Sequence, residues 1–259
     1  MITMKPTEHL VGITVQGDYY DFDAFEDAAH RLTGVWPDED YKDPYYASSN
    51  RLLGICYDIR HARQGDRELA VRDNGLSREM MKWHNIVMSE QTAYFSVNIL
   101  FPEAIFVAAS SEKLLAYAAK YYGKKGEQLK EKENWPFSHK YTEYVQDCGV
   151  IRNFNAQVWS ALGEVIGEVG LENILKAQSP YETYTNYAAQ YIDKLDIDLI
   201  KTKPEKRAGK LKTMAKRIVV PYSDYYQTYR TVSDAAHEYK CSMHELHDPN
   251  LEWPEEIEW

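Results

Sequence analysis

The sequence predicts an α+β protein that is mainly helical, with a few short strands in its N-terminal part. Two kinds of pattern lead to this fold class. Apolar and polar residues alternate over a few short stretches, as they do in half-buried strands. Apolar residues recur at steps of three and four over most of the remaining chain, as they do in amphipathic helices. The longest such pattern predicts one long helix at about 138–169.

Helix and strand are mixed in the first hundred residues. Alternating patterns predict strands at 10–18, 68–71 and 92–100. Helical spacing predicts helices at about 21–33, 48–64 and 77–84. Asp21 is expected to cap the first of these helices, because a carboxylate can accept hydrogen bonds from the free backbone N–H groups of a first helical turn.

A helix that begins at Pro102 and runs to about Tyr121 is expected to lie in the core. Proline suits the first turn of a helix because it has no N–H group to leave unpaired. The stretch from Ala104 to Leu115 is apolar on most sides, which is typical of a helix that is buried all round.

The predicted helix at 138–169 carries a heptad seam with one asparagine in it. The seam consists of Tyr144, Cys148, Ile151, Asn155, Val158, Leu162, Val165 and Val169. A polar residue in such a seam often sets the register of paired helices, so one interpretation is a homodimer through this helix. The other is a helix that packs against its neighbours within the chain.

Composition narrows the class of protein. A chain of 259 residues with 44% hydrophobic residues can bury a substantial core. Three widely spaced cysteines argue against a disulfide framework and indicate a reducing compartment. No stretch approaches the roughly 18 apolar residues of a membrane span, and the N-terminus lacks an apolar signal core. We therefore expect a cytoplasmic protein without a membrane segment.

The net charge of −10 is unevenly distributed along the chain. Residues 201–217 carry eight Lys or Arg residues against one Glu, a local charge of +7, and residues 218–259 carry two basic residues against nine acids, a local charge of −7. This change predicts a main domain at 1–200. The C-terminal part, 201–259, is expected to hold the basic stretch, a helical hairpin and an acidic, aromatic tail.

The basic stretch has two interpretations. It can pair with the acidic parts of the chain, or it can contact the phosphate backbone of a nucleic acid. The candidate contact residues are Lys206, Arg207, Lys210, Lys212, Lys216 and Arg217.

Residues 231–246 resemble a helix-turn-helix. In that pattern Ser233 caps the first helix, Cys241 is the small turn residue and Ser242 caps the second helix. Three features depart from the pattern. Lys240 stands where glycine is usual, and Pro249 would shorten the recognition helix. The acidic Glu245 and Asp248 would repel DNA. An ordinary helical hairpin is the alternative.

The segment 57–67 is the densest group of ionisable residues and the candidate active site. Asp58 and His61 are three apart, hence on one helix face, where a carboxylate can orient the imidazole and raise its basicity for general-base catalysis. Arg60 and Arg67 offer cationic forks for a phosphate group. The candidate catalytic residues are therefore Asp58, Arg60, His61 and Arg67.

Four further residues are candidates for binding: Asp18, Asp21, Arg63 and Asp66. An alternative explains all of these catalytic and binding candidates without an active site. They would form a network of ion pairs that joins the 48–64 helix to Asp18, Asp21 and Asp23. Such closely spaced carboxylates can bind Mg²⁺, but they more often cap a helix. We assign no metal site, and no sequence motif identifies a cofactor.

Two motifs, Tyr57-Asp58-Ile59-Arg60-His61-Ala62 with Gln64-Gly65-Asp66-Arg67 and Gly17-Asp18-Tyr19-Tyr20-Asp21-Phe22, resemble an uncharacterised bacterial family of domains of unknown function over about residues 6–200. The resemblance implies a bacterial or phage-related origin. It also implies a shared polar centre made by Asp18, Asp21, Asp58, Arg60, His61, Asp66 and Arg67.

A second resemblance concerns ribonucleases. Arg78 with His84 and Arg230 with His237 show the spacing of Arg and His that is found in helical endoribonucleases of the HEPN type (higher eukaryotes and prokaryotes nucleotide-binding). There the arginine would hold the phosphate and the histidine would move the proton, without a metal. About one such match is expected by chance in a chain of this composition.

These observations leave three functional hypotheses. The leading one is a non-enzymatic interaction or regulatory protein whose C-terminal part contacts a nucleic acid. The second is a hydrolase acting on phosphate esters or nucleic acids, either HEPN-like or metal-assisted, centred on Asp58, Arg60 and His61. The third is a structural subunit of a protein complex.

Overall fold

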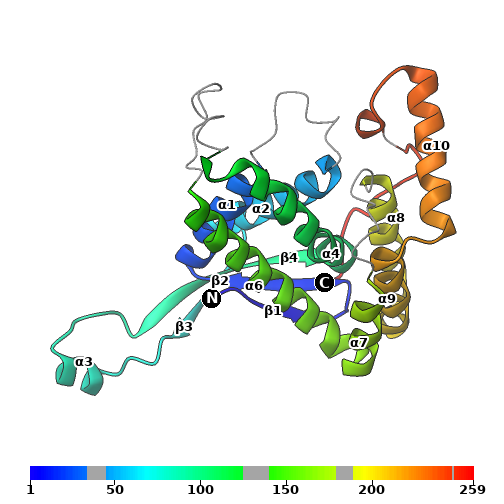
Figure 1. Cartoon of the computed structure of the whole chain (residues 1–259). Coiled ribbons are helices and arrows are strands. Elements are labelled where there is room, and N and C mark those ends of the chain that lie inside the picture. The colour runs from blue at the N-terminus through cyan, green and yellow to red at the C-terminus, as the bar shows by residue number, and fades with distance from the viewer. Residues whose placement is uncertain (34–44, 125–139, 179–188, 247) are drawn as a thin grey trace.

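The computed structural model describes residues 1–33, 45–124, 140–178, 189–246 and 248–259. Its helices pack around one four-stranded antiparallel sheet (Figure 1). The order of the strands in the sheet is β1 (Thr3–Pro6), β2 (Gly12–Gly17), β4 (Gln91–Leu100), β3 (Glu68–Asp73). The predicted mainly helical α+β fold is confirmed, and the three predicted strands are present.

The sheet has one apolar and one polar face because successive side chains of a strand point to opposite sides. Ile13 and Val15 of β2 are fully buried on the apolar face. On the polar face the Thr14 hydroxyl donates a hydrogen bond of 2.7 Å to the side chain of Asn98 on β4. The helices that contact the sheet are α1 (Tyr19–Thr33), α2 (Tyr46–Arg63), α4 (Phe101–Ala118) and α6 (Tyr141–Ile166).

Helix α4 is the centre of the fold, as its composition predicts. It follows β4 without a loop and carries Pro102 in its first turn. It packs against α2, α6, α8 (Ala189–Ile200) and α9 (Pro204–Val219), and a single 3₁₀ turn, η2 (Ala119–Tyr121), continues it. Small residues at its contacts, among them Ala104 and Ala108, let these neighbours approach closely.

The middle of the heptad seam of α6 is buried within the chain, whereas Val169 at its end is exposed. Ile151, Val158 and Leu162 are fully buried, and the Asn155 side chain donates a hydrogen bond of 2.6 Å to the Ser111 hydroxyl on α4. The long helix predicted at about 138–169 is present, but it ends at Ile166 rather than at residue 169. Gly167 adopts φ 77°, which ends α6, and α7 (Glu168–Ala177) begins there. Residues 138 and 139 lie outside the described part.

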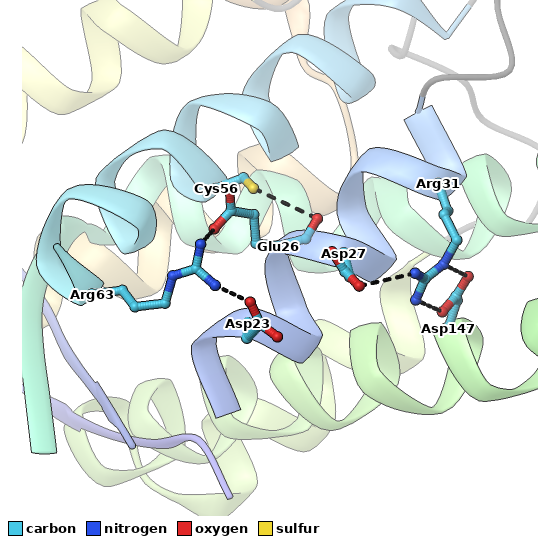
Figure 2. A network of polar contacts seen from close by, with 7 residues as sticks. All are labelled: Asp23, Glu26, Asp27, Arg31, Cys56, Arg63 and Asp147. Carbon is cyan, nitrogen blue, oxygen red and sulfur yellow. Dashed lines mark hydrogen bonds and ion pairs between the residues drawn. The ribbon is translucent and has the colours of Figure 1, made fainter. Parts of the chain in front are cut away.

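Two contacts determine how α1 is placed. Asp18, rather than Asp21, caps it: the Asp18 carboxylate accepts a hydrogen bond of 2.9 Å from the Asp21 backbone N–H, and the Asp21 carboxylate accepts one of 3.1 Å from the Asp18 N–H. Near the end of α1, Arg31 forms a two-pronged pair with the buried Asp147 of α6, with distances of 2.8 and 2.9 Å (Figure 2).

Residues 231–246 do not form a helix-turn-helix, and the alternative helical hairpin is absent as well. Ser233 lies inside α10 (Ser223–Tyr239), which is continuous up to Lys240. Lys240 adopts φ 55°, the left-handed conformation that ends a helix. Ser242 then begins only one 3₁₀ turn, η3 (Met243–Glu245), with a capping box to Glu245. One turn cannot serve as a recognition helix.

Arg207 of α9 ties three distant segments together. Its side chain is 3% exposed and donates hydrogen bonds to the carbonyl oxygens of Thr202 (2.8 Å), Ile200 (3.0 Å) and His9 (2.7 Å). A longer bond of 3.5 Å reaches the carbonyl of Glu258. The guanidinium therefore satisfies backbone acceptors at the end of α8, at the β1–β2 turn and in the 251–259 segment.

None of the described helices combines the length with the apolar character that a membrane crossing requires.

Replacing Arg207 with methionine is expected to lower the free energy of unfolding by about 3 kcal/mol, because buried carbonyl groups lose a charged donor and each unpaired group costs about 1–3 kcal/mol. Chemical denaturation measures this loss. The matched control is Lys206→Met at the exposed neighbouring position, where a change within about 0.5 kcal/mol is expected. Equal losses in the two variants would contradict the assigned role of Arg207.

Candidate functional site

The candidate catalytic residues lie in the last turns of α2 and just beyond, but their partners differ from those expected. His61 Nδ1 lies 2.9 Å from the carboxylate of Asp66, not of Asp58. The reason is Gly65, whose φ of 89° turns the chain back so that the Asp66 N–H bonds the His61 carbonyl at 3.0 Å. Asp58 instead lies 3.7 Å from Arg67.

Arg63 joins α2 to α1. Its guanidinium binds the carboxylates of Asp23 and of Glu26, the latter at 2.7 Å, and lies over the ring of Tyr19 (Figure 2). Asp23 thus belongs to an ion pair between two helices. This is the kind of contact expected if the charged residues form a structural network rather than an active site. The other two acids of that predicted network, Asp18 and Asp21, are occupied in capping α1.

Arg60 contacts a neighbouring side chain on its own helix. Its guanidinium lies 5.0 Å from the centre of the Tyr57 ring, and that ring also meets His61 edge-on. A stacked arginine of this kind is held against its own helix. The four candidate catalytic side chains therefore divide between two local arrangements.

A cavity of about 580 Å³ lies along one side of β4. β3 begins at Glu68, opposite Ser96, so on the side of β4 away from β2 the described residues place no strand next to residues 97–100. This unpaired edge forms a wall of the cavity. Asp58 and Arg67 line the cavity, whereas Arg60 and His61 are not among its lining residues. Two of the four predicted catalytic residues therefore line the cavity.

The 251–259 segment closes the cavity on another side through Ile257 and Trp259. The Trp259 ring lies so close to Gly12 of β2 that a Cβ atom there would be 2.7 Å from it. Glycine at this position therefore allows the segment to lie against the sheet.

A buried acidic centre lies next to the cavity, between α2, α4 and α8. Arg51 pairs with Asp193 at 2.6 Å and with Glu103 at 3.5 Å. Burial raises the pKa of Glu103, and the nearby charge of Asp58 raises it further, against the opposite effect of Arg51. Burial also raises the pKa of the fully buried Asp196 well above its usual range.

This acidic centre was missed in the sequence because its residues come from three helices. The only signal was the position of Asp196 on the apolar side of α8, between Leu195 and Leu199. Within the described residues, no group of three or more acidic, His or Cys side chains is arranged to hold a metal ion. A carboxyl that keeps its proton can donate a hydrogen bond, and that is the chemistry available here.

The Arg and His pairs of the ribonuclease pattern lie elsewhere. Arg78 and His84 occupy opposite ends of the short helix α3 (Arg78–His84), where Arg78 pairs with Glu90 at 3.4 Å. Arg230 and His237 lie along α10. Neither pair lines the cavity beside β4.

The basic candidates of α9 are not equivalent. Arg207 is buried, so the expectation that it contacts a nucleic acid is wrong. Lys210 pairs with Asp198 at 2.6 Å, and Arg217 pairs with Asp224 at 3.2 Å. The three that face solvent without an ion pair in the described part are Lys206, Lys212 and Lys216.

Residues 68–95 form an exposed arm, which comprises β3, α3 and the first half of β4. Figure 1 shows it projecting away from the helices. Trp83 is 82% exposed and Val87 is 98% exposed at its tip. The other large apolar residues exposed on the arm are Leu69, Val71, Met80, Ile86 and Met88. This surface was not predicted from the sequence, although residues 86–88 form an apolar run beside a short predicted helix.

Local contacts hold the tip in shape. The Ser77 hydroxyl accepts a hydrogen bond of 3.2 Å from the Met80 N–H and caps α3. The Asn74 side chain donates one of 2.8 Å to the carbonyl of Ser89 across the base of the tip. The apolar side chains are thus presented on an ordered backbone rather than buried beneath it.

Replacing Asp196 with asparagine is expected to weaken the dependence of stability on pH. Burial makes the pKa of Asp196 higher in the folded chain than in the unfolded chain. Such a carboxyl contributes its full stabilisation of the folded chain at pH values below its pKa in the unfolded chain. This contribution is lost as the pH rises through its pKa in the folded chain. Unfolding free energies at about pH 5 and about pH 8 should therefore differ less in Asp196→Asn than in the wild type. Asp198→Asn, at an exposed position of α8, is the control. An unchanged pH dependence in Asp196→Asn would count against a buried, protonated Asp196.

Comparisons with known proteins support the resemblance to an uncharacterised family of domains, without confirming the two motifs. Neither the curated proteins nor the solved structures contain a match to this chain. A family model described as a domain of unknown function, DUF6904, matches residues 2–259. The match extends beyond the predicted 6–200 and includes the C-terminal part. The chain belongs to the DUF6904 family.

Proposed function

We propose that this protein is a non-enzymatic interaction protein that binds a protein partner through the arm of residues 68–95. The observation that carries this proposal is the exposure of Trp83 and Val87 on an ordered, projecting element. Large apolar side chains that gather on a projecting surface usually become buried in an interface.

The composition of the tip supports a protein partner. Tryptophan and methionine are enriched at the centres of protein interfaces, and the tip exposes Trp83, Met80 and Met88. A pre-formed tip loses little conformational entropy on binding. Charges of both signs surround it, among them Arg78 and Glu79. An element that binds a membrane surface usually carries mainly basic charge, so the tip fits a protein better than a lipid bilayer.

The hydrolase hypothesis has less support. General-base catalysis requires the base to lie within hydrogen-bonding reach of a bound substrate. His61 is paired with Asp66, and neither His61 nor Arg60 lines the cavity that contains Asp58 and Arg67. The acidic centre beyond Asp58 offers carboxyls whose pKa is raised by burial, and the described residues place no nucleophile–base pair beside them.

A photo-crosslinking residue tests the proposed role of the arm. Trp83→p-benzoylphenylalanine should give a covalent adduct with a protein when cells that express the variant are irradiated, and mass spectrometry identifies the adduct. The same change at Tyr239, an equally exposed aromatic residue on α10, is the control and should give no such adduct. Adducts only at Tyr239, or none at either position, would contradict the proposal.

A second candidate function is contact with a nucleic acid through α9. The observation that favours it is the solvent-facing set Lys206, Lys212 and Lys216, for which the described part of the structure shows no ion pair. Three positive charges on one helix can replace counterions along a phosphate backbone.

Binding titrations with DNA and RNA over a series of salt concentrations test this second candidate. The triple Lys→Glu variant at 206, 212 and 216 should abolish binding, because each lost phosphate contact lowers the salt slope by about one. A control with the same change in charge reverses the exposed lysines Lys82, Lys120 and Lys194. If the control loses binding to the same extent, or if the wild type does not bind, α9 is not a nucleic-acid contact.

A further inference from the structure

The outer edge of β3 is bare in the described part of the chain. β3 is the last strand of the sheet, and its only neighbour is β4. Unpaired edges readily add another strand, and proteins usually protect them with proline, a bulge or a covering element. β3 contains no proline, and its register with β4 is regular from Glu68 to Asp73. Leu69 is 56% exposed and Val71 is 58% exposed on one face of this strand.

The backbone direction shows which residues can bond at this edge. The Asn74 N–H donates to the carbonyl of Glu90 at 3.0 Å, and these two residues continue the β3–β4 register. Hydrogen-bonded pairs alternate in an antiparallel ladder, so the even-numbered residues of β3 point their N–H and C=O groups toward β4. The odd-numbered residues Leu69, Val71 and Asp73 therefore point these groups outward.

The charges of β3 are complementary to those of a second copy of β3 that runs antiparallel to it. The segment reads Arg67-Glu68-Leu69-Ala70-Val71-Arg72-Asp73. With Ala70 at the centre of an antiparallel pair, Glu68 of each copy lies opposite Arg72 of the other, and Leu69 lies opposite Val71. One step further out, Arg67 lies opposite Asp73. A two-fold interface requires this kind of self-complementarity.

We infer that two copies of this chain pair antiparallel through β3, in the register centred on Ala70. The inference rests on the proposal that the arm is a protein-binding element, and it names a second copy as the partner. In this register the outward groups of Leu69 in one copy meet those of Val71 in the other, which closes hydrogen-bonded pairs on both sides of the two-fold axis. The sheets of the two copies then form one continuous sheet of eight strands.

Backbone direction and charge select this register over its neighbours. A register centred between two residues would place an outward-pointing residue opposite an inward-pointing one, so it cannot form the ladder. A register centred on Val71 would place Leu69 opposite Asp73. A register centred on Leu69 would place Arg67 opposite Val71. Only the centre at Ala70 matches both charge pairs and the apolar pair.

Antiparallel pairing also provides a surface for the apolar tips. β3 runs from the body of the molecule toward the tip of the arm (Figure 1). In the pair, each tip therefore extends past Glu68 of the other copy toward the end of its α2. The exposed ring of Tyr57 lies at that end, in contact with His61, which bonds Asp66. The apolar tip of one copy thus approaches an exposed aromatic ring of the other.

Charge reversal tests the pairing by sedimentation velocity over a wide range of concentration. Wild type should dimerise. Glu68→Arg and Arg72→Glu should each raise the dissociation constant by at least about tenfold, because each change places like charges opposite each other twice. The variant with both changes should dimerise like the wild type. In a mixture of the two single variants every pair is complementary, so the mixture should form a heterodimer that neither variant forms alone.

A proline variant separates edge pairing from folding. The N–H of Val71 points outward, so Val71→Pro removes a donor at the free edge without removing a bond of the β3–β4 ladder. Val71→Pro should be monomeric, with the circular dichroism spectrum of the wild type. A monomeric wild type at every concentration would overturn the inference, as would single and double charge variants that behave alike.

The result is distinguishable from a failure of the proposed function. If the wild type is monomeric while the crosslinker at residue 83 still captures another protein, the arm binds a different partner and only the pairing through β3 is wrong. If the dimer forms and the adduct at residue 83 is a second copy of the chain, both stand.

Discussion

The burial of most of α4 is the constraint on which the rest of this structure depends. A helix that is apolar over most of its surface must be covered from several directions, and no single neighbour can do this. The sheet, α2, α6, α8 and α9 each cover part of it. Because β4 continues directly into α4, the position of the helix also determines where the sheet ends. The cavity beside residues 97–100 lies at this junction.

Buried and half-buried arginines connect the elements that surround this core. Arg31 links α1 to α6 through Asp147, Arg51 links α2 to α8 through Asp193, and Arg207 links α9 to the β1–β2 turn and to the 251–259 segment. A chain with a net charge of −10 needs such cations wherever its carboxylates approach one another. Arginine suits this role because its planar fork binds several oxygen atoms at once. Arg207, which the sequence suggested as a nucleic-acid contact, is thus used to hold the fold together.

The arm differs from the body in the way that it is stabilised. Its backbone is paired in the sheet and capped at the tip, but its large side chains contribute little to a core of their own. Under the proposed function, a partner that covers such an element would add to its stability. The helices fold around α4, while the arm keeps its apolar residues exposed.

The sequence by itself determined the periodic elements, because alternation and helical spacing are local properties that burial then enforces. The strands at β2 and β4 and the buried α4 were predictable in this way, and so was the confirmed fold class. Which side chains pair with one another was not predictable. Whether His61 is held by Asp58 or by Asp66 depended on the turn at Gly65, and Arg207 could not be told from its exposed lysine neighbours until α9 was packed. The seam of α6 matched a dimer as well as an intramolecular contact, and the bond from Asn155 to Ser111 became visible only once α6 was packed against α4. Burial, the joining of charges from separate helices and the exposure of the arm are tertiary properties, since each depends on residues far apart in the chain.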